Sequence, residues 1–260
     1  MHLVIDIGNT NAVFGVYRSD RLLHRWRVGT DIQKTRDEYL VQTRKFLAEG
    51  GIDSSLILGA TISSVVPCLT ATFQHITREL TGSSSYVVDH ESFTDMAIRV
   101  DFPSQVGTDR LVNALAGYRL LGTSLIIVDC GTATNFDVVS ANGEFLGGVI
   151  SPGLSLSLEA LIKKTHKLPG IKMEPPARVI GSNTVASMQS GLLFGYAGLV
   201  DSMIARIGEE LGYSPKVVAT GGLARILQSV SIAIKTVIDD LTLRGLYFIS
   251  RSIGDRQRPQ

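Results

Sequence analysis

Apolar residues in this chain fall into short runs with the length and composition of β-strands. Runs rich in Val and Ile that end at Gly, Asn, Asp or Ser are typical of strands. Three such runs open each half of the chain, so each half is predicted to begin with a β-meander. The predicted strands are 2–7, 12–18, 21–28, 56–62 and 86–88 in the first half, and 124–129, 134–140, 144–150 and a run beginning at 216 in the second.

Helices are predicted between these strands from their capping signals. Thr35 followed by Glu38 forms a capping box, and Gly50 stops the helix that it starts. Pro67 and Gly82 bound a second helix. Strands with flanking helices predict an α/β or α+β fold. Further helices are predicted after residues 107–110, over 154–163, from 182–184 towards Leu211, and after residues 239–240.

One short motif occurs twice, once at the start of each half. In both copies an apolar strand ends in Asp, then in Gly followed by hydroxyl or amide side chains, and an apolar return strand follows. Asp6 and Gly8 in the first copy correspond to Asp129 and Gly131 in the second. A glycine turn lets backbone N–H groups approach a phosphate, and the acid can hold a cation. A single copy is explained by an ordinary hairpin, but two copies indicate a duplicated fold with two phosphate loops.

Two further segments carry candidate chemistry. Thr220-Gly221-Gly222 follows a predicted strand, and paired glycines let a flat group such as adenine lie on bare backbone. Gly107-Thr108-Asp109-Arg110 starts a helix. Asp109 either stabilises the dipole of this helix or acts as a base. Arg110 either binds an anion or is a solvated helix residue.

Composition narrows the possible functions. The chain has 260 residues, 25 basic and 24 acidic side chains, and a net charge of +1, so there is no bulk electrostatic argument for binding nucleic acid or a membrane. Two cysteines, Cys68 and Cys130, are typical of a reduced cytoplasmic protein. No apolar run is long enough to predict a transmembrane helix. The histidines show no metal-ligand spacing.

Small residues mark one face of the predicted helix that ends near Leu211. Gly191, Gly195 and Gly198 recur at helical spacing. Such a stripe lets another helix approach closely. The partner is either a helix of the same chain or one from a second subunit.

The ordered motifs resemble those of the acetate and sugar kinase/Hsp70/actin superfamily, and more narrowly the type III pantothenate kinases. The narrower resemblance extends from Met1 to about Ile253. It rests on the motifs at 6–11, 64–67, 107–110, 129–134, 147–148, 152–153, 183–184 and 241–246. It implies two duplicated ribonuclease H-like domains of the actin-like ATPase type, each a mixed sheet flanked by helices, with ATP in a cleft between them. The implied reaction is phosphorylation of the 4′-hydroxyl of pantothenate by ATP, the first step of coenzyme A synthesis, in a cytoplasmic homodimer that needs Mg²⁺ and K⁺ or NH₄⁺.

The resemblance also implies roles for individual residues. Asp109 would be the catalytic base. Asp6 would hold Mg²⁺, through water, and Asp129 would hold the monovalent cation. The residues expected at ATP and its phosphates are Asp6, Ile7, Gly8, Asn9, Thr10, Asn11, Ala12, Val13, Thr132, Gly221 and Gly222. Those expected at pantothenate are Gly107, Thr108, Asp109, Arg110 and Thr184.

The duplication also predicts the domain boundaries. An N-terminal domain is expected over 1–114, a C-terminal domain with a dimerisation helix over 115–253, and a flexible tail over 254–260. Two alternative functions remain open at this point. One is another small-molecule kinase or a phosphatase on the same fold. The other is a non-catalytic nucleotide-binding regulator, which would not need the acids at 6, 109 and 129.

Overall fold

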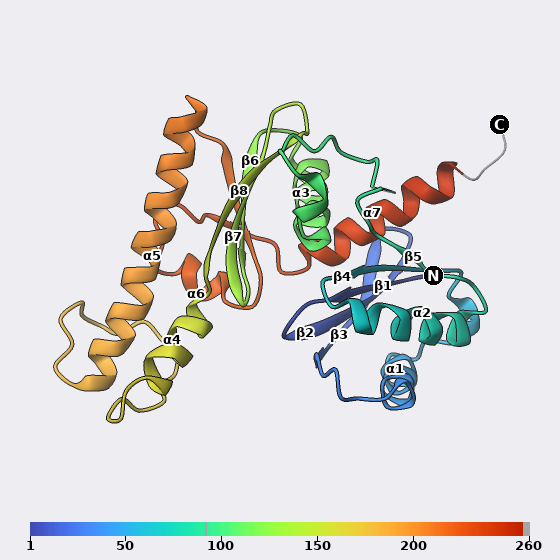
Figure 1. Ribbon diagram of the computed structural model, residues 1–260, viewed down its shortest axis with the longest axis horizontal. Helices are drawn as coiled ribbons and strands as arrows, with labels where there is room; N and C mark the ends of the chain where they lie inside the picture. The colour runs from blue at the N-terminus through green and yellow to red at the C-terminus, as the bar shows by residue number, and fades with distance from the viewer. Residues whose placement is uncertain (92, 257–260) are drawn as a thin grey trace. The chain divides into compact units, whose positions relative to one another are not determined.

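The computed structural model describes residues 1–91 and 93–256, which form two compact units (Figure 1). Unit 1 contains Met1–Ala97, Asp101–Ala116 and the helix α7 (Leu241–Arg256). Unit 2 contains Ile98–Val100 and Gly117–Asp240. The boundary between the units therefore falls within the helix α3 (Thr108–Leu121).

Unit 1 is built on a five-stranded mixed sheet with the order β3-β2-β1-β4-β5. β1, β2 and β3 are antiparallel neighbours, whereas β4 and β5 run parallel to β1. Two short 3₁₀ helices, η1 (Ser54–Leu56) and η2 (Pro103–Gln105), lie in the connections. The strands and other helices of this unit are β1 (His2–Ile7), β2 (Asn11–Arg18), β3 (Arg21–Gly29), α1 (Arg36–Glu49), β4 (Ala60–Ser64), α2 (Pro67–Thr81), β5 (Tyr86–Val87) and α7.

Unit 2 repeats this topology. Its sheet has the order β10-β9-β6-β7-β8, with β6, β7 and β8 antiparallel and β9 and β10 parallel to β6. When each order starts from the last strand of the meander, β8-β7-β6-β9-β10 of unit 2 matches β3-β2-β1-β4-β5 of unit 1 strand for strand. The elements are β6 (Leu125–Cys130), β7 (Ala133–Val139), β8 (Phe145–Pro152), α4 (Leu154–Lys163), α5 (Thr184–Leu211), β9 (Lys216–Thr220), α6 (Ala224–Gln228) and β10 (Thr236–Val237). The predicted class, duplicated mixed sheets flanked by helices, is confirmed.

Each sheet has helices on both faces. In unit 1, the alternate residues Leu3, Ile5 and Ile7 of β1 pack in a core with α1 and α2. α7 lies on the other face, where Leu243 approaches Gly15 of β2. In unit 2, α4, α5 and α6 cover one face of the sheet (Figure 1). Burial on both faces explains why the inner strands are almost continuously apolar.

Local sequence signals set most helix ends. The capping box is present at α1: the Thr35 hydroxyl accepts a hydrogen bond from the Glu38 N–H at 3.3 Å, and the Glu38 carboxylate accepts one from the Thr35 N–H at 2.7 Å. α2 begins at Pro67 and ends at Gly82, whose φ of +71° is the left-handed conformation that glycine favours. Asn183 caps α5, since its side chain accepts from the Ala186 N–H.

Three predictions differ from the structure. The strand expected at 56–62 lies at Ala60–Ser64, because the side chain of Asp53 caps the 3₁₀ turn η1. α7 belongs to unit 1, because it packs on β1, β2 and β4, whereas the sequence grouped it with the second domain. α7 also continues to Arg256, so the expected flexible tail does not begin at 254. Residues 257–260 of that tail lie outside the described residues.

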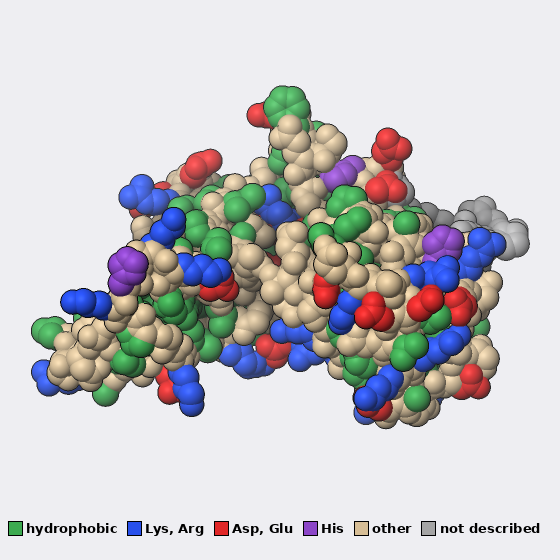
Figure 2. Space-filling view, turned by 60° about the horizontal axis from the view of Figure 1, so that its bottom comes forward, with side chains coloured by type: hydrophobic (Ala, Val, Ile, Leu, Met, Phe, Trp, Pro, Cys, Tyr) green, Lys and Arg blue, Asp and Glu red, His purple; other side chains and the backbone are tan. Residues whose placement is uncertain are grey.

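The surface is electrostatically mixed. On the face shown in Figure 2, basic and acidic side chains are interspersed, in keeping with the net charge of +1. Within the described part of the chain, no helix combines the length and apolar character needed to cross a membrane.

Candidate active site

The first Asp-x-Gly motif lies where two parallel strands of unit 1 end side by side. Asp6, near the end of β1, is in register with Ser63 of β4. The following turn is closed by a hydrogen bond from the Gly8 N–H to the Asn11 carbonyl at 3.0 Å. Asn9 and Thr10 at its tip are exposed. The turn therefore presents exposed backbone and a hydroxyl next to a carboxylate, as a phosphate loop requires.

The Gly107–Arg110 segment lies beside the same strand ends. Thr108, the first residue of α3, is buried, and its hydroxyl lies 3.2 Å from the hydroxyl of Ser63. Because Ser63 is the register partner of Asp6, unit 1 brings the start of α3 close to the first motif. The structure thus brings Asp6 close to Thr108, the residue before Asp109, although the two motifs lie about a hundred residues apart in the sequence.

Asp109 is a half-buried acid whose pKa is raised. Burial raises the pKa of its carboxyl above the ordinary value of 3.8. A hydrogen bond from the Arg110 N–H at 2.9 Å and the Arg110 charge partly oppose that rise. Gly107 leaves room for this carboxylate, because a Cβ there would lie 2.5 Å from Oδ1. A buried acid with a raised pKa accepts a proton more readily than a solvated acid at a helix end.

The second motif repeats the first arrangement in unit 2. Asp129 is in register with Thr220 of the parallel strand β9, as Asp6 is with Ser63. The turn is closed by a hydrogen bond from the Gly131 N–H to the Ala133 carbonyl at 3.0 Å. Thr132 is exposed, and its carbonyl accepts a hydrogen bond from the Gly153 N–H at 2.9 Å. Both copies therefore place an acid at a strand end and a small exposed turn after it.

The Thr-Gly-Gly motif lies directly against this second loop. Gly221 has a φ of +91°, and a Cβ there would lie 2.6 Å from Oδ1 of Asp129 and 2.7 Å from the carbonyl oxygen of Cys130. Gly222 beside it is exposed. Burial and the Asp129 charge raise the pKa of the Cys130 thiol to about 12, so this cysteine is not a nucleophile at neutral pH. In unit 2 the predicted phosphate and adenosine motifs are therefore neighbours.

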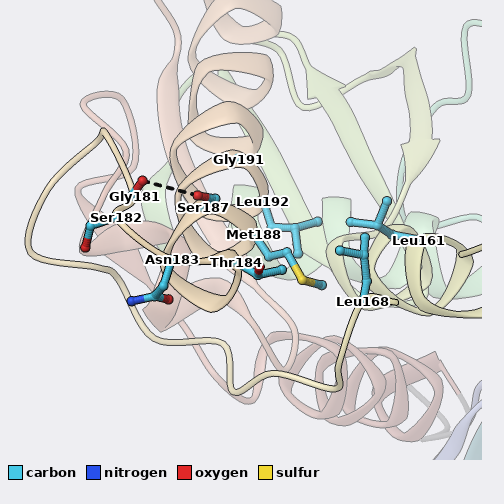
Figure 3. A pocket seen from close by; sticks show the side chains of 10 residues that line it. All are labelled: Leu161, Leu168, Gly181, Ser182, Asn183, Thr184, Ser187, Met188, Gly191 and Leu192. Carbon is cyan, nitrogen blue, oxygen red and sulfur yellow. Dashed lines mark hydrogen bonds between the residues drawn. The ribbon is translucent and has the colours of Figure 1, made fainter. Parts of the chain in front are cut away.

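Thr184 lies at a separate place in unit 2. It lines an open pocket of about 730 Å³ bordered by α4, α5 and the segment before α5 (Figure 3). Leu161, Leu168, Met188 and Leu192 supply its apolar wall. Asp129, Thr132, Gly221 and Gly222 do not line this pocket. Within unit 2, Thr184, a predicted pantothenate contact, therefore does not share a pocket with the predicted ATP contacts.

Sequence reasoning missed three residues that hold these segments in place. Ser63 joins β4 to Thr108. Thr30, after β3, donates its hydroxyl to the Gly8 carbonyl at 2.6 Å. A ring nitrogen of His90 hydrogen-bonds the Val106 carbonyl, next to Gly107. Ser63 and Thr30 are short polar residues at strand ends, which is a weak signal, and their contacts lie 45 and 22 residues away along the chain.

The carboxylate oxygens of Asp6 and Asp129 are donor atoms of the kind that hard cations prefer. Residues 1–91 and 93–256 contain no group of three or more His, Cys, Asp or Glu side chains that could hold a metal. A cation would therefore bind to one carboxylate together with backbone, water or phosphate oxygens, as Mg²⁺ commonly does beside a nucleotide. Around Gly221, the Asp129 carboxylate and the Cys130 carbonyl supply two oxygen atoms close together. The oxygen donors at Asp129 are thus of the kind that hard cations take.

Comparison with known proteins gives a consistent result. Residues 2–206 match the family model described as type III pantothenate kinase. A protein of Geotalea daltonii named type III pantothenate kinase is 47% identical over 246 residues, covering 95% of this chain and 96% of that protein. One of the same name from Anaeromyxobacter sp. is 45% identical over 258 residues, covering 99% of this chain and 100% of that protein.

Solved structures agree at the level of the fold. A conserved Baf family protein from Campylobacter jejuni aligns with a TM-score of 0.61 at 18% identity, over 97% of this chain and 99% of that one. A ROK family glucokinase from Streptomyces griseus aligns with a TM-score of 0.55 at 14% identity, over 96% and 99%. At such identities the likeness shows the fold alone.

Proposed function

The chain belongs to the type III pantothenate kinase family, and from this we propose that it phosphorylates the 4′-hydroxyl of pantothenate with ATP, the first step of coenzyme A synthesis. The observation that carries the proposal is identity of 45–47% to proteins of that name over nearly the whole chain. The alternative of a non-catalytic regulator loses support, because it would not need the three acids. Asp6 and Asp129 lie near the ends of β1 and β6, and Asp109 lies at the start of α3.

Phosphoryl transfer asks the protein mainly to position reactants and stabilise charge. The pantothenate oxygen attacks the γ-phosphorus, the bond to the β,γ-bridging oxygen breaks, and ADP leaves. The proton of the attacking hydroxyl must go to an acceptor. We assign that role to Asp109, whose raised pKa suits it to take a proton.

The phosphates are assigned to the two Asp-x-Gly turns. Asp6–Val13 of unit 1 supply exposed backbone and the Thr10 hydroxyl. Thr132 of unit 2 supplies a second hydroxyl, and Gly221 and Gly222 border the adenosine.

Two cations are assigned to the carboxylates of these turns. Asp6 would hold Mg²⁺ through water, and Asp129 would hold K⁺ or NH₄⁺ with nearby carbonyl oxygens. Bound there, the cations would neutralise phosphate charge. Without them, phosphates and carboxylates would repel one another.

Pantothenate is assigned to Gly107, Thr108 and Arg110, beside the base, and to Thr184. Arg110 offers a cation for the carboxylate of the substrate. Thr184 lines the apolar pocket of unit 2.

A homodimer formed through α5 is part of the proposal. Gly191, Gly195 and Gly198 are exposed, and a Cβ on any of them would meet no atom within 4 Å. The glycine stripe therefore does not pack on a helix of its own chain among the described residues. This supports the second of the two alternatives, a partner subunit. The proposed location is the cytoplasm, where free cysteines such as Cys68 and Cys130 stay reduced.

The direct test is ADP release measured with pantothenate added or omitted. ADP formation that requires pantothenate, with a phosphorylated product of matching mass, supports the proposal. ADP release with another hydroxyl compound but not with pantothenate would make the protein a different kinase. Replacing K⁺ and NH₄⁺ by Na⁺ at constant Mg²⁺ should abolish turnover, and full turnover in Na⁺ alone contradicts the role of Asp129.

A further inference from the structure

Thr30 is bonded to both sides of the first phosphate loop. Its hydroxyl donates to the Gly8 carbonyl at 2.6 Å, and its backbone N–H donates to the Thr10 carbonyl at 2.9 Å. The Gly8 N–H is itself used inside the turn, where it bonds to the Asn11 carbonyl at 3.0 Å. A single residue thus fixes two of the three peptide units that form the tip of the loop.

Holding a carbonyl also fixes the N–H of the next residue. The peptide group is planar and trans, so its C=O and N–H point in opposite directions. With the Gly8 carbonyl directed at Thr30, the Asn9 N–H must point away from Thr30. The same holds for the Asn11 N–H, since the Thr10 carbonyl is directed at Thr30. The bonds to Thr30 therefore set the direction of the amide donors of an exposed loop.

The segment containing Thr30 is tied to the core of unit 1. The hydroxyl of Tyr39 accepts from the Asp31 N–H at 2.8 Å and donates to the Asp31 carbonyl at 3.0 Å. Tyr39 comes from α1, is 0% exposed, and packs on Phe73 with ring centroids 4.9 Å apart. The loop is thereby connected through Thr30 and Asp31 to a ring that cannot move without disturbing the core.

We propose that Thr30 is a positioning residue that aims the backbone amides of Asn9 and Asn11 at the phosphates of ATP. This deepens the proposed function and rests on it. Amides already held in place bind an anion without the cost of ordering the loop. The side chain of Thr30 acts through the loop and needs no contact with ATP, so it is not a catalytic residue.

The test compares variants that differ by one hydroxyl. Thr30→Val removes the hydroxyl at nearly constant volume, and Thr30→Ser restores it. Thr77→Val is the matched control, because the Thr77 hydroxyl also donates to a backbone carbonyl, that of Phe73 at 2.9 Å, within α2. The loss of one hydrogen bond predicts that Thr30→Val raises the KM for ATP about five- to tenfold. The KM for pantothenate should stay unchanged, and Thr30→Ser and Thr77→Val should keep the wild-type KM for ATP.

ATP binding measured by calorimetry without pantothenate distinguishes a wrong role for Thr30 from a wrong proposed function. If the wild-type protein binds ATP and phosphorylates pantothenate while Thr30→Val has the same KM and Kd for ATP, the role of Thr30 is wrong and the proposed function stands. If the wild-type protein does neither, the proposed function itself fails. If Thr30→Val does not fold, Tyr39→Phe decides, because it frees Asp31 and should weaken ATP binding in the same selective way. Unchanged ATP binding in a folded Tyr39→Phe protein overturns the inference.

Discussion

The carboxylate of Asp129 packs on the bare backbone of Gly221, so closely that a Cβ on Gly221 would lie 2.6 Å from Oδ1. Gly221 also has a φ of +91°, which side-chain-bearing residues rarely adopt. The second phosphate loop and the Thr-Gly-Gly motif are thus parts of one tightly packed arrangement. This relationship explains why a glycine is needed at position 221, and it applies whatever nucleotide is bound.

Gly221→Ala should damage both stability and ATP use. The methyl group would press on Asp129 and on the Cys130 carbonyl, and the positive φ adds strain, together about 2–4 kcal/mol of unfolding free energy. Urea unfolding and the KM for ATP would show both effects. Gly170→Ala is the control, because position 170 has no atom within 4 Å of an added Cβ. Equal stability of the two variants would contradict the packing described here.

Asp109→Asn should lower turnover without lowering the stability of the fold. Loss of the base is expected to lower kcat by at least about a hundredfold. The folded pKa of Asp109 is raised, so at neutral pH its half-buried charge opposes folding, and the uncharged Asn should leave the melting temperature equal or higher. Steady-state kinetics and thermal unfolding measure the two quantities. Near wild-type turnover in a folded Asp109→Asn protein would remove Asp109 from the role of base.

The role of Asp109 as the base also predicts how the rate falls at acid pH. A base must be ionised to accept a proton, so kcat/KM should fall as the pH decreases through the raised pKa of Asp109 in the free protein. The midpoint of this limb should therefore lie above 3.8, the ordinary carboxyl value.

His2 should make folding sensitive to mild acid. Burial, with the charge of the amino terminus, lowers the pKa of this side chain from 6.5 to about 4. The unfolded chain takes up this proton near pH 6.5 and the folded chain only near pH 4, so stability is retained above 6.5 and lost as the pH falls between these values. The loss is roughly 2–3 kcal/mol by the end of this window.

Urea unfolding at pH 7 and pH 5 would measure this effect. His2→Gln can still bond to Thr61, whose hydroxyl lies 2.9 Å from the His2 ring, but it carries no titrating group. The difference in stability between the two pH values should therefore be smaller in His2→Gln than in wild type. The same difference in both proteins would assign the acid sensitivity to other groups.

The two cysteines should differ in reactivity. Cys68 is exposed, whereas Cys130 is buried and the pKa of its thiol is raised to about 12. Because the thiolate is the reactive form, iodoacetamide at pH 8 should modify Cys68 in the native protein and both residues after unfolding. Peptide mass spectrometry would show which residue is modified. Rapid native modification of Cys130 would mean that β6 opens far more easily than its burial indicates.

Local signals in the sequence predicted most elements of the fold. The capping box at Thr35 and Glu38 and the left-handed Gly82 act over a few residues, so their effect can be deduced without the rest of the chain. The duplicated Asp-x-Gly motif predicted the duplicated sheets for the same reason. It encodes a strand, a turn and a return strand in one short segment.

Long-range packing could not be predicted in this way. The sequence of α7 predicts an amphipathic helix but does not say which sheet it covers. β10 has only the two residues Thr236 and Val237, too few to show a periodicity. Among the candidate site residues, positions at strand ends could be deduced. The hydrogen bonds of Ser63 and Thr30 that hold them depend on contacts between distant segments.

The return of α7 to the first sheet has a consequence for biosynthesis. The face of β1, β2 and β4 that α7 covers stays bare until the whole of unit 2 has been translated. The core of unit 2 needs no residue beyond Asp240, so every residue of that core leaves the ribosome before α7 does. Until α7 emerges, the nascent chain carries an exposed apolar face on its first sheet, and this is the stage at which a chaperone has most to protect.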